Sequence, residues 1–288
     1  MMVLILFAIL VIIGICAGIV GSIIGLGGGI VIIPALTLLL GVPISYAAGA
    51  SLISTIATSS GAASAYVRDR ISNMKIGMSL EIGTTMGAII GAVIAAFIYK
   101  NNLDSLIFII FGIVLLTSIY PTLKRSKRDL PTKKKADATT KIFQMKGRYF
   151  DNATKKTVEY VGIRWWLGEI VMFFAGVISG LLGIGSGVLK VLAMDSGMNL
   201  PAKVSTSTSN FMIGVTAVTG TVIYWELGYI QPFLAGSSAV GVVIGAFIGS
   251  KIFNKLENRR IELILLIAIF VLAIEMIIRG VSLWSLRI

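Results

Sequence analysis

The stretch Gly25-Leu-Gly-Gly-Gly-Ile-Val-Ile-Ile-Pro34 interrupts a long apolar run near the start of the chain, and Gly183-Ile-Gly-Ser-Gly-Val-Leu-Lys190 interrupts another in the second half. Because each glycine costs a helix about 1 kcal/mol relative to alanine, we expect both helices to break here. In a membrane, a break is tolerated only where it is buried in protein or lines a cavity. We name residues 25–29 the first glycine elbow and residues 183–187 the second. Two such breaks in one chain indicate the substrate site of a transporter.

The composition places the chain in a membrane. It is 56% hydrophobic, its mean hydropathy is +0.95, and several runs approach the roughly 20 apolar residues that cross a bilayer. The chain holds one cysteine and no histidine, which excludes an intrachain disulfide, His-based catalysis and HExxH zinc chemistry. We therefore expect no enzyme, no cofactor and no metal site. The net charge of +12 fits the basic cytoplasmic loops of membrane proteins, and no nucleic-acid partner is expected.

The sequence repeats itself. Adding 158, the difference between Gly25 and Gly183, to a position in the first part gives its counterpart in the second. The matched positions are Gly18, Gly25, Gly27, Gly29, Pro43, Ser51, Thr58 and Tyr66 with Gly176, Gly183, Gly185, Gly187, Pro201, Ser209, Thr216 and Tyr224. The chain is therefore interpreted as a duplicated unit: a first transmembrane repeat at 1–123, a basic insert at 124–163 and a second transmembrane repeat at 164–288.

Each repeat contains about five apolar segments. They run over 3–24, 28–40, 44–66, 76–99 and 103–120 in the first repeat, and over 165–182, 186–197, 202–225, 231–253 and 261–279 in the second. The second segment of each repeat is too short to cross a bilayer at 1.5 Å per residue. We predict an all-α polytopic membrane protein whose repeats each begin with a helix, a glycine elbow and a half-helix. The elbow pair could be a re-entrant hairpin or two crossings.

The loop charges predict that the two repeats are inverted relative to each other. The loop at 68–75 is basic, whereas its counterpart at 226–233 has no lysine or arginine; the loop at 100–104 is nearly balanced, whereas its counterpart is basic. Positive charge marks the cytoplasmic side, so both termini are predicted outside and the insert 124–163 in the cytoplasm. The insert is predicted to hold two short strands. It is either a solvated loop, or it has a regulatory or lipid-headgroup role through Lys133–Lys135.

The elbows and their neighbours supply donors for an anion. Freed amides at the start of a half-helix, with the positive end of its dipole, favour negative charge. Hydroxyls spaced three and four residues apart on the third segments share one face. Both features also serve ordinary helix packing. The candidate substrate-binding residues are Gly27, Gly28, Gly29, Ser51, Ser54, Thr55, Gly185, Ser186, Gly187, Lys190, Ser207, Ser209 and Asn210.

Lys190 is a charge in the second half-helix, where the first repeat has Ile32. Such a charge is costly in a membrane unless it faces a cavity or a partner. It could neutralise a bound anion, extend to the membrane surface, or pair with an acid such as Asp195 or Glu81. Glu81 and Asp195 are themselves candidates for proton coupling.

The pattern Gly25-Leu-Gly-Gly-Gly-x-x-x-x-Pro34, then Gly41-Val-Pro43 and Ala-Gly-Ala-Ser51, repeated in weaker form, resembles the TauE/SafE family of sulfite exporters and organosulfur-anion permeases. The resemblance covers nearly all of the chain outside the insert. It implies a secondary transporter, an exporter, of sulfite or an organosulfonate in the cytoplasmic (cell) membrane. The second motif departs from the family pattern at Ser186, at Leu192 in place of proline, and at Lys190.

We expect the anion to bind at the midplane between the elbows and to move by alternating access, coupled to a proton or to sodium. An anion channel of the same fold is the alternative. Counterflow of labelled against unlabelled anion distinguishes the two.

Overall fold

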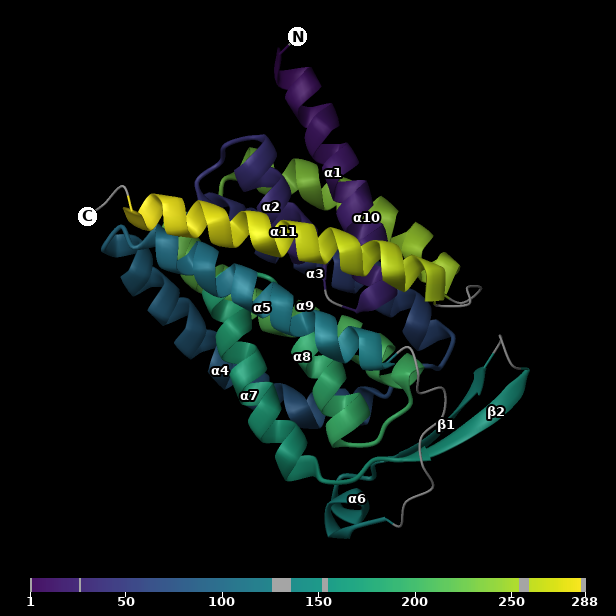
Figure 1. The fold of residues 1–288 in the computed structure, drawn as a ribbon. Coiled ribbons are helices and arrows are strands. Elements are labelled where there is room, and N and C mark those ends of the chain that lie inside the picture. Colours follow the sequence, from purple (N-terminus) through teal and green to yellow (C-terminus); the bar gives the residue numbers. More distant parts are fainter. Residues whose placement is uncertain (1, 26, 126–135, 152–154, 254–258, 286–288) are drawn as a thin grey trace.

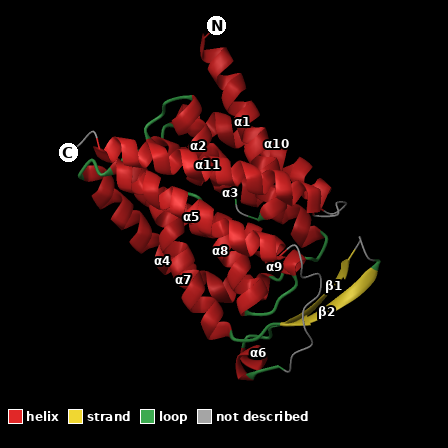
Figure 2. Ribbon diagram, in the orientation of Figure 1, coloured by secondary structure: helices red, strands yellow, loops and turns green. Residues whose placement is uncertain are grey.

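The structure is a computed structural model that describes residues 2–25, 27–125, 136–151, 155–253 and 259–285. Helices dominate it, and its strands form one small hairpin at an end of the molecule (Figures 1 and 2). The first half comprises α1 (Met2–Ile24), α2 (Gly29–Pro34), the π-helical turn η1 (Ala35–Leu39), α3 (Ile44–Arg68), α4 (Met74–Lys100) and α5 (Asp104–Arg125). The second comprises α7 (Trp165–Leu182), α8 (Gly187–Leu192), η2 (Ala193–Gly197), α9 (Ala202–Glu226), α10 (Pro232–Phe253) and α11 (Arg259–Ser285).

The prediction of an all-α polytopic membrane protein is confirmed. Within the described residues, four helices are long and apolar enough to cross a membrane, namely Val3–Ile23, Met74–Lys100, Trp165–Leu182 and Pro232–Ile252. The two helices α3 and α9 are less apolar because they are rich in Ser, Thr, Gly and Ala and are largely buried between the other helices. The surface of α4 shows the lipid-facing pattern, since Met78, Ile82 and Met86 are all more than half exposed at spacings of four residues.

Each glycine elbow folds the chain back on itself. A side-chain carbon placed on Gly28 would lie 3.6 Å from the backbone of Ala17, eleven residues earlier in the sequence. Two helices continuing in one direction could not bring these residues together, so α1 and α2 form a hairpin. In the second half α8 packs against both α7 and α9 in the same manner. A re-entrant hairpin and two opposite crossings both reverse the chain in this way, so the choice between them stays a prediction.

The two halves of the sequence are interlocked. The first helix of each half packs on the fourth helix of the other, giving the pairs α1 with α10 and α4 with α7. Glycines at every fourth position, such as Gly83, Gly87 and Gly91 on α4, form a glycine stripe that makes this close approach possible. A side-chain carbon on Gly91 would lie 2.8 Å from the amide nitrogen of Leu181 on α7. One group of helices therefore contains α1, α2, α3 and α10, and a second group contains α4, α7, α8 and α9. The helices α3 and α9 connect the two groups.

Equivalent hydrogen bonds recur in the two halves. The hydroxyl of Tyr66 on α3 donates to the carbonyl oxygen of Ser22 at 3.0 Å, and that of Tyr224 on α9 donates to the carbonyl oxygen of Gly180 at 3.3 Å. Both donor and acceptor shift by the same 158 positions (224 − 66 and 180 − 22). The duplication seen in the sequence is therefore also present in the contacts, whereas the inverted orientation of the halves in the bilayer stays a prediction.

The insert folds into α6 (Ala138–Ile142) and a hairpin of β1 (Lys146–Asp151) and β2 (Lys156–Val161), which confirms the two predicted strands. Asp137 caps the start of α6. Burial acts to raise the pKa of its carboxyl, but hydrogen bonds from the Arg164 amide and from Thr139 and Thr140 outweigh burial and lower that pKa below its ordinary value. Lys133–Lys135 lie outside the described residues.

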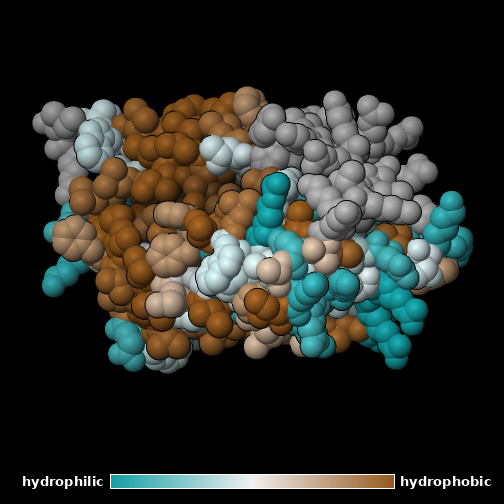
Figure 3. Space-filling model, turned by 90° about the horizontal axis from the view of Figure 1, so that it is seen from below, coloured by the Kyte–Doolittle hydropathy of each residue, from teal (hydrophilic) through white to brown (hydrophobic). Residues whose placement is uncertain are grey.

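The hairpin is held against the helices at one end of the molecule. The carboxylate of Asp151 accepts a hydrogen bond from Nζ of Lys203, at the start of α9, at 2.5 Å. The side-chain amide of Asn73, which precedes α4, donates to the hydroxyl of Tyr160 at 3.0 Å. Figure 3 shows broad apolar surface over the left part of one face and hydrophilic side chains gathered at the right, on the side where the hairpin lies in Figure 1. This is the division expected of a membrane protein with one soluble cap.

Candidate anion site

The two glycine elbows meet in the interior. A side-chain carbon placed on Gly27 would lie 3.4 Å from the carbonyl oxygen of Ile184, and one placed on Gly29 would lie 3.0 Å from its Cα atom. The matched glycines Gly27 and Gly185 have φ angles of 77° and 75°. Only glycine adopts this left-handed conformation without strain, which explains why both elbows repeat it. The prediction that the elbows lie together is thus satisfied by the geometry.

Several polar groups at this junction lack partners. Within the described residues no hydrogen bond is donated by the amides of Gly27, Gly185 or Gly187. The hydroxyls of Thr55 and Ser186 are buried and have no hydrogen-bond partner in the described part of the chain. Thr55 lies between the elbows, because its methyl group is 3.1 Å from a carbon built on Gly27 and 2.8 Å from one built on Gly185. Unpaired buried donors of this kind are rare in proteins, and a bound anion would satisfy them.

The matched serines hold the elbows in place. Ser51 on α3 donates to the carbonyl oxygen of Gly183 at 2.6 Å, and Ser209 on α9 donates to that of Gly25 at 3.0 Å. Each hydroxyl therefore connects a helix of one half to the elbow of the other. Ser209 also lies 3.3 Å from the carbonyl oxygen of Gly187.

The remaining candidates have hydrogen-bond partners within the protein. Gly28 donates through its amide to Thr58 at 3.3 Å, and Ser54 shares a hydrogen bond of 3.1 Å with Ser238 of α10. The hydroxyl of Ser207 is used by the backbone of its own helix, at Val204. The side-chain amide of Asn210 donates to the carbonyl oxygen of Ser22 at 3.2 Å.

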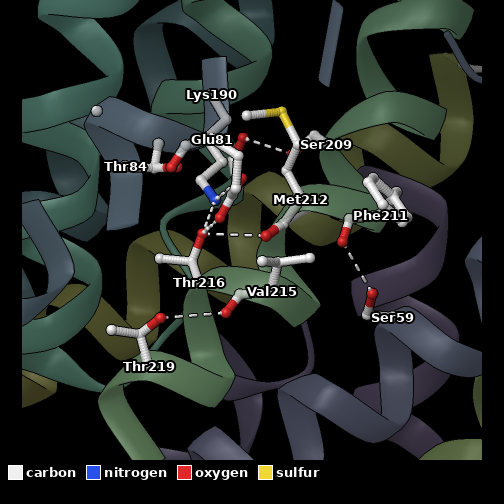
Figure 4. Close-up of polar contacts among 12 residues, drawn as sticks. Ser59, Glu81, Thr84, Lys190, Ser209, Phe211, Met212, Val215, Thr216 and Thr219 are labelled. Carbon is white, nitrogen blue, oxygen red and sulfur yellow. Dashed lines mark hydrogen bonds and ion pairs between the residues drawn. The ribbon is translucent and has the colours of Figure 1, made fainter. Parts of the chain in front are cut away.

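Lys190 belongs to a buried charge cluster beside the second elbow (Figure 4). It is 0% exposed on α8, its Nζ lies 3.8 Å from Oε2 of Glu81 on α4, and it donates to the hydroxyl of Thr216 on α9. That hydroxyl lies 2.6 Å from Oε1 of Glu81. Figure 4 shows the Lys190 and Glu81 side chains directed toward each other with Thr216 at their meeting point. Of the three readings of Lys190, the geometry excludes extension to the membrane surface.

The cluster lies at the level of the elbow. Thr216 corresponds to Thr58, and Thr58 contacts the first elbow through the amide of Gly28. The repeat therefore predicts that Thr216 lies next to the second elbow, and the backbone amide of Lys190 donates to the carbonyl oxygen of Ser186 in that elbow at 3.3 Å. Asp195 lies in η2, five residues beyond Lys190 along the half-helix.

Residues 10–276 match the family model described as sulfite exporter TauE/SafE. The chain belongs to the TauE/SafE family. This TauE/SafE protein is 32% identical over 282 residues to the probable membrane transporter protein YunE of Bacillus subtilis, covering 96% of this chain and 98% of that protein. A second B. subtilis relative, the probable membrane transporter protein YdhB, is 28% identical over 82% of this chain and 86% of its own length.

A probable membrane transporter protein of Haemophilus influenzae is 26% identical over 94% of each chain. No solved structure shows a significant match. The family and these relatives support membrane transport by a multi-pass membrane protein.

A small cavity lies beside the elbows of this TauE/SafE protein. The cavity beside the elbows, between α2, α5, α7 and α8, has a volume of about 10 Å³ and is lined by Ile30, Ser118 and Ser186 among mostly apolar side chains. A space of that size admits about one water molecule. This cavity is therefore too small for an anion with several oxygens.

Two residues of the site were missed in the sequence. Thr216 was visible only as a repeat match to Thr58, and its role depends on contacts across three helices. Glu169 on α7 is the other: its Oε1 accepts from the amide of Gly83 at 2.8 Å, and its Oε2 is buried with no hydrogen-bond partner among the described residues. No spacing rule links Glu169 to Glu81, because the connection comes from the packing of α4 on α7.

Proposed function

We propose that this TauE/SafE protein is a secondary transporter that exports a small sulfur-containing anion, such as sulfite or an organosulfonate. The observation that carries the proposal is the meeting of two glycine elbows at which, among the described residues, the amides of Gly27, Gly185 and Gly187 and the buried hydroxyls of Thr55 and Ser186 have no acceptor, near Lys190. An oxyanion would accept hydrogen bonds from several of these groups at once. The family and the named relatives support transport across a membrane.

The proposed location is the cell membrane, with the chain crossing several times, both termini outside and the insert 124–163 in the cytoplasm. This orientation rests on the loop charges. The hairpin and its salt bridge from Asp151 to Lys203 would then cover the cytoplasmic end of α9.

Alternating access would occur between the two groups of helices described above. Each group contains one elbow and is closely packed within itself, whereas the groups connect mainly through α3 and α9. The hydrogen bonds from Ser51 to Gly183 and from Ser209 to Gly25 cross between the groups. These two bonds would break and reform as the site opens to one side and then the other.

Exchange across a vesicle membrane tests the proposal. The purified protein is reconstituted into liposomes loaded with unlabelled sulfite, and ³⁵S-sulfite is added outside at a much lower concentration. A carrier gives a transient uptake of label above the equilibrium level. The reason is that each unlabelled sulfite carried out of the vesicle returns the binding site to the outside, where it binds labelled sulfite. Steady conductance without this overshoot would show that the protein is an anion channel and not a carrier. Vesicles without protein give the background uptake.

The choice of anion is tested by thermal unfolding. A ligand that prefers the folded state raises the melting temperature as its concentration passes the dissociation constant. Sulfite, sulfate, thiosulfate, taurine and sulfoacetate are compared at equal ionic strength. A rise with sulfate alone, or with none of the five, would contradict a site for sulfite or organosulfonates.

A further inference from the structure

The buried charges around the second elbow balance one another only while the site is empty. Lys190 supplies one positive charge and Glu81 one negative charge, and both side chains are withdrawn from water, at 0% and 6% exposure. If a monoanion binds beside Lys190, the cluster contains one positive and two negative charges. An uncompensated charge in the interior is strongly unfavourable.

Glu81 is the group that can restore the balance. Its Oε1 accepts from the hydroxyl of Thr216, but its Oε2 is buried and has no hydrogen-bond partner in the part of the chain that the structure describes. The ion pair from Oε2 to Nζ of Lys190 is 3.8 Å long, beyond hydrogen-bond distance. Oε2 is therefore a position at which a proton can reside without displacing an existing hydrogen bond.

The groups that face Glu81 from the surrounding helices agree with this role. Lys190 from α8 is the positive group, and Thr216 from α9 and Thr84 from its own helix are neutral. Glu169 from α7 is the second carboxylate nearby, bonded to the amide of Gly83, two residues beyond Glu81. Glu169 is partly exposed in the second turn of α7.

We propose that Glu81 binds the proton that accompanies each transported monoanion, while Lys190 transfers its ion pair from Glu81 to the anion. The exchange is balanced: the carboxylate of Glu81 gains one proton from water, the anion gains the ammonium group as its partner, and the buried cluster stays neutral. Release reverses both steps. The inference rests on the proposed function and adds to it the coupling ion, one proton for each negative charge carried.

The test uses sulfite uptake into liposomes that contain the wild-type protein or the Glu81→Gln variant. The vesicle interior is made about two pH units more alkaline than the outside, and potassium with valinomycin holds the membrane potential at zero. A one-to-one proton coupling can concentrate the solute up to about a hundredfold, since each pH unit contributes a tenfold ratio. Sulfite that ionises further inside the vesicles is trapped equally by both proteins, so their ratio isolates the contribution of Glu81.

We expect the wild-type protein to accumulate about tenfold more sulfite than Glu81→Gln, while the variant still exchanges labelled sulfite, within about tenfold of the wild-type rate. Glutamine imitates the protonated carboxyl, so the variant should bind the anion without a proton. Glu226→Gln, at the exposed end of α9, is the matched control and should accumulate like the wild type.

Equal accumulation by the wild type and Glu81→Gln would overturn the inference, as would accumulation driven by a sodium gradient at equal pH. Loss of exchange in a Glu81→Gln protein that purifies as a native, monodisperse species would also overturn it. These outcomes are distinct from failure of the proposed function, because that failure appears as an absence of sulfite counterflow in the wild-type protein.

Discussion

Replacing Lys190 with methionine is expected to destabilise the protein strongly. Methionine has a similar length but no charge, so the change leaves the carboxylate of Glu81 buried with the hydroxyl of Thr216 as its donor at 2.6 Å. Breaking a buried ion pair in this way costs about 3–5 kcal/mol, mostly because the remaining charge is uncompensated. The loss should therefore be recovered by removing the second charge.

The double variant Lys190→Met with Glu81→Gln tests that explanation. It leaves a neutral amide in place of the carboxylate, with a residual cost of about 1–3 kcal/mol for imperfect hydrogen bonding. We expect it to be more stable than the single variant by about 2 kcal/mol, the difference between these ranges. The free energy of unfolding is measured in mixed micelles of dodecyl maltoside and SDS.

An exposed ion pair provides the control. Arg68 and Asp69 lie 3.5 Å apart with side chains 77% and 29% exposed, and Arg68→Met should change stability by less than about 1 kcal/mol, as is usual for surface pairs. The reasoning is refuted if Lys190→Met is as stable as the wild type, or if adding Glu81→Gln gives no recovery.

Lys190→Ala is expected to weaken sulfite binding more than tenfold, about 1.4 kcal/mol, because it removes the positive charge beside the second elbow; unchanged affinity by calorimetry would exclude Lys190 from the site. Gly87→Ala should cost about 1–3 kcal/mol in thermal unfolding, since its methyl group would lie 2.9 Å from the amide of Val177 and force α4 from α7. Gly236→Ala, with no atom within 4 Å, should be neutral or stabilising. Ser51→Ala should slow sulfite counterflow by releasing the carbonyl of Gly183, whereas Ser60→Ala, whose exposed hydroxyl bonds its own helix, should not. Asp151→Asn should accelerate tryptic cleavage of the hairpin by weakening its contact with Lys203, and equal cleavage of Asp151→Asn and of the exposed-site control Glu159→Gln would contradict this docking.

Most of the helices could be predicted from hydropathy and glycine punctuation. The segment predicted at 165–182 is α7, Trp165–Leu182, and that at 44–66 is α3, Ile44–Arg68. These boundaries follow from local chemistry: Pro43 precedes α3, and Gly183 ends α7 in the left-handed conformation. The direction of the half-helices could not be derived in this way, because it depends on the contact between Gly28 and Ala17.

The helix that packs against each glycine stripe could not be predicted from the sequence either. Gly83, Gly87 and Gly91 indicate that some helix approaches α4 closely, but a stripe of small residues does not identify which helix. The same limit applied to Lys190, for which Glu81 and Asp195 were equally plausible partners. Packing of α4 on α9 and α7 places Glu81 opposite Lys190, whereas the helical rise carries Asp195 away from it.

The exchange of helix partners between the halves has a consequence for biogenesis. Until α10 emerges from the ribosome, α1 has no surface to receive its glycine stripe, and α4 must likewise await α7. A chain terminated after the first half would leave both stripes facing lipid. Two fragments divided within the basic insert should therefore be unstable when each is produced alone. They should regain stability when they are expressed together, because each supplies the helices that pack against the other's glycine stripes.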